Sequence, residues 1–430
     1  MIARTWRAWG SRSIDRNLML RLLTTLIVIA SAVSVSVAGT FAGAVSNVLT
    51  EVRLRWPTPE IKVAISSTFG LGPVNIAAGS DVEAALERSF RRWETAAGIR
   101  FEIVRTADAN VSPAGRAGDG VSLVTAGGSA ENMLLFAEGL EDSPAATRLF
   151  FDKAGNITEA DIALNPMQRF STTGEPGTYD LEAVLTHEIG HMLGLDHSPV
   201  FGALMYEHQA ANGVFGIPGR QDVMLTAADA AALRAIYGPR EDDVECCSEA
   251  DIELGSAGAT VWAENERGVA ASGVSDPTGR VTFGGLMPGS YVFYARTASG
   301  LATRLGGADL GSGEVRSFKA KAGTGSSAIS IEHLGANGRL YQLPVALTRG
   351  RTHTIYLGGK GLGAQTLVGT DARGINFDPN TLRLHDYGPN VTVISISVYI
   401  PHETVPGAFT IWARDKGGQQ AYAIGGLVIR

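Results

Sequence analysis

Residues 186–197 read THEIGHMLGLDH, which places three histidines and one glutamate at fixed spacing. In a helix His187 and His191 are four positions apart, so both imidazoles leave the same face and can bind one cation. Glu188 is the next residue after His187. Its carboxylate can therefore reach a water molecule on that cation without binding the cation itself. The spacing predicts a helix that carries a metal centre.

The residues that follow extend this pattern. Gly194 can adopt a positive φ angle, which ends the helix and turns the chain back so that His197 supplies a third nitrogen. Three protein ligands with an open fourth position indicate one catalytic zinc ion, because a structural site is closed by a fourth ligand. A short H-E-x-x-H run can arise by chance, but the added glycine and third histidine are unusual in a chain with 8 histidines among 430 residues. Thr178 or Asp180 can cap the start of the helix.

Met205 lies shortly downstream, in the run Ala-Leu-Met-Tyr at 203–206. A methionine in an apolar run is ordinarily core filling, but a methionine turn after a third zinc histidine underlies the metal in metzincins. The sequence resembles the matrixin branch of the metzincin zinc endopeptidases. The Gly-Leu-Asp-His-Ser run at 194–198 favours that branch. Serralysins and astacins typically have a tyrosine two residues after the methionine, where this chain has Glu207.

The resemblance covers residues 56–239 and implies an α+β catalytic domain, with a mixed twisted sheet and three helices. It implies a zinc metalloendopeptidase that acts on protein or peptide substrates through a zinc-activated water, with Glu188 as general base and acid. Gly194 and Met205 would give structural support. The local patterns agree: 61–65 alternates as a strand, and Ser80 with Glu83 forms a capping box that predicts a helix. The zinc ligands implied are His187, His191 and His197.

A calcium ion is a further expectation from the resemblance. Residues 149–162 read as two strands around an Asp/Gly/Asn turn, and carboxylates there are candidate oxygen ligands for Ca²⁺. A plain solvated hairpin explains the same residues equally well. Vertebrate matrixins also carry a second, structural zinc, but all histidines here lie at or after His187, so we do not expect that site. The candidate calcium ligands are Asp152, Glu159 and Asp161.

The second half of the chain changes to short alternating strands and glycine turns, which are typical of β-sandwiches. We expect an acidic linker at 240–250 and then two all-β sandwich domains. Residues 251–335 resemble carboxypeptidase regulatory-like modules, and residues 338–430 resemble an immunoglobulin-like fold of the IPT kind. The linker holds the only two cysteines, Cys246 and Cys247. Because a bridge between adjacent cysteines is strained, free thiols or an intermolecular link are expected.

Residues 1–45 combine a basic start with an apolar run from Leu22 to Val45 that has no charged residue. This pattern indicates export, either by a cleaved signal peptide or as an uncleaved transmembrane signal anchor. The histidines would then face the extracytoplasmic side, as in a secreted or extracellular-matrix protein. Contact with the membrane is expected only through this segment.

The net charge of −7 argues against nucleic acid as a partner. A different function class stays open, namely an extracellular adhesion protein whose β modules carry the function and whose peptidase domain is minor or degenerate. For an enzyme, a substrate would lie extended beside an edge strand, and residues 132–136 are the strand that we expect to serve. The oligomeric state stays open.

Overall fold

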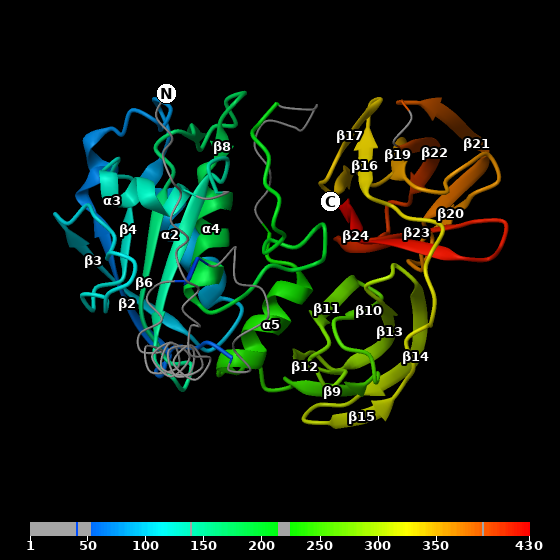
Figure 1. Ribbon diagram of the computed structural model, residues 1–430, viewed down its shortest axis with the longest axis horizontal. Helices are drawn as coiled ribbons and strands as arrows, with labels where there is room; N and C mark the ends of the chain where they lie inside the picture. The colour runs from blue at the N-terminus through cyan, green and yellow to red at the C-terminus, as the bar shows by residue number, and fades with distance from the viewer. Residues whose placement is uncertain (1–39, 42–52, 138–139, 214–223, 389–390) are drawn as a thin grey trace, which may run out of the picture.

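A computed structural model of the chain describes residues 40–41, 53–137, 140–213, 224–388 and 391–430. Figure 1 shows two halves. One half, drawn in blue to green, contains the helices, and the other, drawn in green to red, contains only strands. The expected order, an α+β part followed by a part built of β-strands, is therefore observed.

The first half is built on a six-stranded sheet in the order β1-β5-β6-β4-β2-β3. Strands β2, β3, β4 and β6 pair in parallel, while β5 runs antiparallel to β6. Strand β1 pairs with the opposite edge of β5 at two positions, Thr40 with Leu149 and Phe41 with Arg148. The strands are β1 (Thr40–Phe41), β2 (Glu60–Ser66), β3 (Arg100–Thr106), β4 (Leu123–Thr125), β5 (Ala145–Phe151) and β6 (Ile157–Leu164).

Three long helices accompany this sheet, as expected. They are α2 (Val82–Glu94), α4 (Leu181–Met192) and α5 (Ala227–Tyr237). Helix α2 packs on α4, and the carboxylate of Glu182 on α4 bonds both Arg88 and Arg92 of α2. The shorter elements are η1 (Ser67–Leu71), α3 (Ala130–Met133), η2 (Leu134–Phe136), β7 (Phe170–Ser171) and β8 (Tyr179–Asp180).

Helix α2 does not begin as the capping box predicts. Asp81 caps it, and its Oδ1 accepts a hydrogen bond from the N–H of Ala84 at 3.1 Å. The Ser80 hydroxyl instead accepts from the N–H of Thr172. Aspartate is as good a cap as serine, so adjacent candidates compete and the tertiary contact decides.

The prediction that residues 132–136 form the substrate-binding edge strand is wrong. These residues continue α3 into η2, because Ser129 caps α3 by accepting a hydrogen bond from the N–H of Asn132. Asn132 then turns inward and donates to the carbonyls of Ala109 and Gly127. The strand beside the histidine-bearing helix is β5, which packs against α4.

The second half contains two β cores. In the first, strands β14-β13-β10-β11 face the sheet β12-β9-β15, and in the second, β23-β24-β18 face the sheet β17-β16-β19-β22-β21. The strands of the first are β9 (Ser248–Glu253), β10 (Thr260–Asn265), β11 (Gly268–Val274), β12 (Arg280–Leu286), β13 (Gly289–Arg296), β14 (Ala302–Leu310) and β15 (Val315–Lys319). Those of the second are β16 (His333–Ala336), β17 (Arg339–Tyr341), β18 (Val345–Leu347), β19 (Arg351–Gly359), β20 (Leu367–Gly369), β21 (Asn376–Asp386), β22 (Thr392–Ile400), β23 (Gly407–Arg414) and β24 (Gln420–Ile429).

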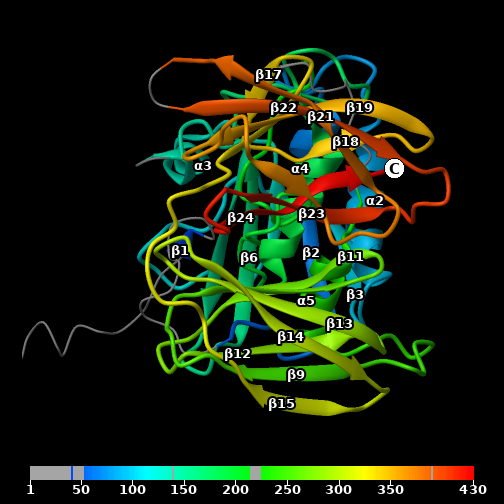
Figure 2. The ribbon, with the colours of Figure 1, turned by 90° about the vertical axis from the view of Figure 1, so that its right-hand side faces the viewer.

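The two β modules share one β-sheet. Strands β11 and β23 pair in parallel at Gly268 and Ala408, which makes one sheet continuous across both modules. Figure 2, viewed from the β side, shows the two modules one above the other with β11, β23 and β24 at the centre. Helix α5 of the first half packs against β11 and β12. The side-chain Nε–H of Arg234 on α5 donates a hydrogen bond to the carbonyl of Gly285 at 2.9 Å.

Two further expectations concern the adjacent cysteines and the N-terminal segment. The structure joins Cys246 and Cys247 by a disulfide across a cis peptide bond, so the expectation of free thiols or an intermolecular link is wrong. Nearly all of 1–45, the predicted signal segment, lies outside the described residues. Within the described residues, no helix is long and apolar enough to span a membrane.

Candidate metal centre

Helix α4 carries the first two histidines and is fixed at both ends. Asp180 is its cap, one of the two candidates from the sequence, and its Oδ1 accepts from the N–H of Ala183 at 3.0 Å. At the other end, aromatic side chains satisfy carbonyls that a helix leaves without partners. The indole of Trp56 donates to the carbonyl of Met192 at 2.9 Å, and the hydroxyl of Tyr237 donates to that of Leu193 at 2.8 Å.

The predicted turn after the helix is present. Gly194 has a φ angle of +87°, and a Cβ atom there would lie 2.5 Å from the carbonyl oxygen of Leu54. Both the backbone conformation and the close approach therefore require glycine. The turn brings His197 back to the helix face that carries His187 and His191.

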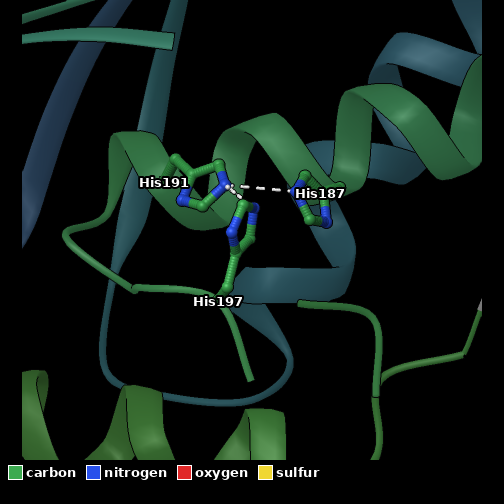
Figure 3. A group of neighbouring side chains, drawn as sticks. All are labelled: His187, His191 and His197. Atoms are coloured by element: carbon green, nitrogen blue, oxygen red, sulfur yellow. Dashed lines mark hydrogen bonds between the residues drawn. The ribbon is translucent and has the colours of Figure 1, made fainter. Parts of the chain in front are cut away.

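The three imidazoles converge, as Figure 3 shows. The Nε2 atom of His191 lies 3.1 Å from Nε2 of His187 and 3.2 Å from Nε2 of His197. A tetrahedral zinc ion with Zn–N bonds of about 2.0–2.1 Å separates its nitrogens by roughly 3.3 Å. The observed spacing agrees with that value. Among the described residues, this is the one group of three or more histidine, cysteine or carboxylate ligands that could share an ion.

The hydrogen bonds behind the rings support a cation at their centre. The Nδ1 atom of His187 lies 2.8 Å from the carbonyl oxygen of Leu204, and Nδ1 of His191 lies 2.8 Å from that of Leu195. A carbonyl accepts only, so each Nδ1 carries the proton and each Nε2 presents a lone pair. Lone pairs that face one another repel, and a cation removes that repulsion. The donor set and its spacing fit zinc.

Burial keeps these imidazoles neutral, the form that binds metal. Burial lowers the pKa of His187 to about 4 and lowers the pKa of His191 well below its usual value. It also lowers the pKa of the half-buried His197. The neighbouring imidazoles act in the same direction, because two positive rings repel.

Glu188 is held beside the triad by a residue that the sequence did not single out. The hydroxyl of Thr147 on β5 donates to Oε2 of Glu188 at 2.6 Å. Burial raises the pKa of Glu188 to about 7, and the hydrogen bond from Thr147 acts against that rise. No local motif marks Thr147, because its role depends on β5 lying against α4.

Met205 lies directly under the helix, as the resemblance implies. A Cβ atom on Gly190 would lie 2.3 Å from Sδ of Met205 and 2.8 Å from Cζ2 of Trp93. The helix surface therefore needs glycine at this point for the methionine to fit. The Trp93 indole also donates to the carbonyl of Thr186 at 2.8 Å. Met205 and Trp93 thus pack directly against Gly190, in the turn of α4 that leads to His191.

Asp229 on α5 supports the methionine turn. Its carboxylate accepts from the N–H groups of Leu204 and Met205 at 2.9 and 3.2 Å. It also forms a capping box with Thr226 at the start of α5. The carbonyl of Leu204 in turn holds the ring of His187. The contact with the methionine turn joins residues 25 positions apart, so it depends on the tertiary fold.

The three candidate calcium ligands do not lie together as one set. Asp152 is exposed and closes its own turn by accepting from the N–H groups of Ala154 and Asn156. Glu159 and Asp161 are buried on β6 and accept from backbone N–H groups of the loop between β3 and β4 and of the first residue of β4. Burial raises the pKa of Asp161 to about 7. Calcium binding stays a prediction.

A cleft opens over the triad. One wall is the start of β5 with the residues before it, and the other wall follows the methionine turn at Glu207 and Gln209. The three histidines and Glu188 form its floor. The remaining lining residues are Leu140, Ser143, Pro144, Ala145, Ala146 and Thr147.

Comparison with known proteins identifies the first half. Residues 68–238 match the family model described as matrixin. This part of the chain is a matrixin domain. Enzymes of the matrixin family are zinc metallopeptidases, which agrees with the histidine triad.

The matrixin relatives include plant and vertebrate proteins. Metalloendoproteinase 1-MMP of Arabidopsis thaliana is 31% identical over 189 residues, which cover 43% of this chain and 45% of that protein. The interstitial collagenase of Sus scrofa is 28% identical over 176 residues, which cover 38% of this chain and 30% of that protein. The chain therefore spans less than half the length of these relatives.

Solved structures add no argument about the β modules. The major pilin subunit of Bacillus cereus is 13% identical, and the match covers 42% of this chain and 69% of that chain at a TM-score of 0.17. Such a score does not support a shared fold. The resemblance of the β modules to carboxypeptidase regulatory-like and IPT domains stays a prediction.

Proposed function

We propose that this chain is a zinc-dependent endopeptidase that hydrolyses peptide bonds in proteins or peptides. The observation that carries the proposal is the convergence of three neutral Nε2 atoms at 3.1 and 3.2 Å, with a buried carboxylate beside them. The matrixin domain and its relatives support the same reaction class.

The ligands of the metal are His187, His191 and His197. A bound zinc ion supplies Lewis-acid chemistry, which polarises a peptide carbonyl and makes water acidic enough to react near neutral pH. The other steps belong to the chain. Glu188 accepts a proton from the attacking water and delivers it to the leaving amine.

The environment of Glu188 suits both halves of that task. Burial raises the pKa of the Glu188 carboxyl, and this direction favours a group that must take up a proton and then release it. The hydroxyl of Thr147 fixes one oxygen of Glu188 and leaves the other for the water. Thr147 also lines the cleft, on the strand along which we propose that the substrate binds.

The substrate is proposed to lie extended along the start of β5. Residues 145–147 line the cleft, and their side of the strand away from β6 pairs with no other described strand. Unpaired backbone groups on such an edge recruit an extended peptide by strand addition. In this proposed arrangement the scissile carbonyl lies over the triad.

The proposed location is extracytoplasmic, as a secreted protein or one held by its N-terminal segment. This rests on the sequence of residues 1–45 and on the mostly extracellular matrixin homologues. Calcium at Glu159 and Asp161 is a secondary proposal that rests on their burial on one strand. The adhesion alternative is not favoured, because the ligand set and Glu188 are intact.

One assay tests the function. The purified chain is analysed for bound metal and incubated with a mixed peptide library, with and without a chelator. We expect about one zinc per chain, cleavage that the chelator abolishes, and loss of about 10²–10⁴-fold in turnover for Glu188→Ala with the metal retained. Glu87→Gln, an exposed carboxylate on α2, is the control and should cleave normally. Comparable turnover by Glu188→Ala would refute the assignment.

A further inference from the structure

The segment between the third histidine and the methionine turn is a closed loop. We name residues 198–206 the docking loop. Its ends meet, because Ser198 and Tyr206 form a β-bridge and the N–H of Ser198 donates to the carbonyl of Met205 at 2.7 Å. His197 immediately precedes the docking loop, and the Leu204 carbonyl within it holds His187. Any shift of this loop therefore moves two of the three metal ligands.

The tip of the docking loop is seated on the second β module. The N–H of Phe201 donates to the carbonyl of Ile424 on β24 at 2.8 Å. Val200 is fully buried, and a Cβ atom on Gly425 would lie 2.4 Å from its Cγ1 atom. Gly425 has a φ angle of +63°, so the turn in β24 that makes room for Val200 is specific to glycine.

Gly202 lies at the same contact. A Cβ atom there would lie 2.8 Å from Cγ2 of Val428 and 3.0 Å from both Cβ of Ala408 and the carbonyl oxygen of Gly425. The loop backbone thus approaches β23 and β24 as closely as a glycine permits. Such a fit holds the loop in one position.

The first β module contacts the base of the loop. The hydroxyls of Ser198 and Ser272 on β11 lie 3.2 Å apart. One apolar cluster then joins all three parts of the molecule. It contains Val200, Ala203 and Ala228 from the matrixin half with Trp262, Tyr422 and Ile424 from the β modules.

We propose that the β modules are part of the metal centre's support, and that docking of residues 198–206 on β11, β23 and β24 positions His197 and the ring of His187 for metal. Val200, Phe201 and Gly202 are positioning residues. A metal ligand on a loop binds more tightly when the loop is already ordered, because ordering then costs nothing at the moment of binding. The modules thus have a role beyond the adhesion that the sequence leaves open.

The test measures metal affinity, so it is separate from peptidase activity, although the meaning of the site rests on the proposed function. Full-length chain is stripped of metal and titrated with Zn²⁺ against a competing chelator, and with Co²⁺ by its visible spectrum. Gly202→Val overfills the contact with β24. We expect its zinc dissociation constant to rise at least tenfold, the tetrahedral Co²⁺ spectrum to weaken, and kcat to fall with KM for peptide nearly unchanged.

Two variants make the result specific. Gly358→Val is the matched control, since Gly358 is buried in β19 against Leu340 and His333, away from the docking loop. It should bind zinc as the wild type does. Adding Val428→Ala to Gly202→Ala removes the closest of the three contacts that the new methyl group makes, and should restore zinc affinity part of the way toward the wild-type value.

Every outcome of these measurements either supports or overturns the positioning role of the docking loop. Unchanged zinc affinity in folded Gly202→Val, or an equal loss in Gly358→Val, overturns the proposal. If Gly202→Val does not fold, Gly202→Ala with and without Val428→Ala decides by loss and rescue of affinity. If metal affinity follows the expected pattern but the wild type cleaves no peptide, the positioning role stands and the proposed function fails.

Discussion

The hydroxyl oxygen of Thr147 lies 2.6 Å from Oε2 of Glu188 and 3.1 Å from the backbone oxygen of the same residue. A single hydroxyl of β5 thus lies within hydrogen-bond distance of both the carboxylate and a main-chain carbonyl of α4. Both residues are almost fully buried. The strand proposed to receive substrate and the carboxylate proposed to move the proton are therefore held in one fixed relation.

Replacement of Thr147 should impair turnover and leave metal binding intact. A hydrogen bond to a charged group contributes about 1.5–3 kcal/mol, so Thr147→Val should lower kcat/KM by roughly 10- to 100-fold. Thr147→Ser keeps the hydroxyl and should retain most of the activity. Steady-state kinetics with measured zinc content checks this. Equal activity in the valine and serine variants would contradict it.

Gly190→Ala should destabilise the protein even though alanine favours helices. Alanine exceeds glycine by about 1 kcal/mol in an exposed helix interior. Here the new methyl group meets Met205 and Trp93 at 2.3 and 2.8 Å, and overpacking of this kind costs about 1–3 kcal/mol. Denaturant unfolding measures the net effect. The double variant Gly190→Ala/Met205→Ala should destabilise less than the sum of the two single variants, whereas additive effects would show that the two residues do not compete for space.

The local part of the metal centre could be predicted from the sequence. The positions of His187 and His191 follow from helical periodicity, and the turn at Gly194 follows from the freedom of glycine. The cap at Asp180 is also local. All of these depend on residues within a few positions of one another, so one stretch of sequence contains the information.

The parts that failed depend on distant contacts. Residues 132–136 are a short apolar run, and such a run is ambiguous between strand and helix until its neighbours are known. Thr147 acquires its role only when β5 lies against α4. Val200 packs against Gly425, which is far from it in the chain, and no periodicity in either segment predicts this contact.

The junction between the β modules should make stability depend on pH. Glu264 on β10 accepts a hydrogen bond from the Trp262 indole at 2.8 Å, and burial raises its pKa to about 7. Because the folded pKa exceeds the unfolded value, the stabilising contribution is complete below about pH 4.5. It is lost as pH rises through about 7, since the unfolded chain ionises first.

The free energy of unfolding of the wild type should therefore fall, relative to that of Glu264→Gln, between about pH 4.5 and 7, by on the order of 2 kcal/mol. The glutamine keeps an oxygen for the indole of Trp262 and carries no charge. Denaturant unfolding across this pH range measures the difference. Glu266→Gln, an exposed neighbour, should follow the wild type at every pH. Parallel curves for wild type and Glu264→Gln would show that Glu264 ionises as it does in water, and the buried contact with Trp262 would then have no influence on its charge.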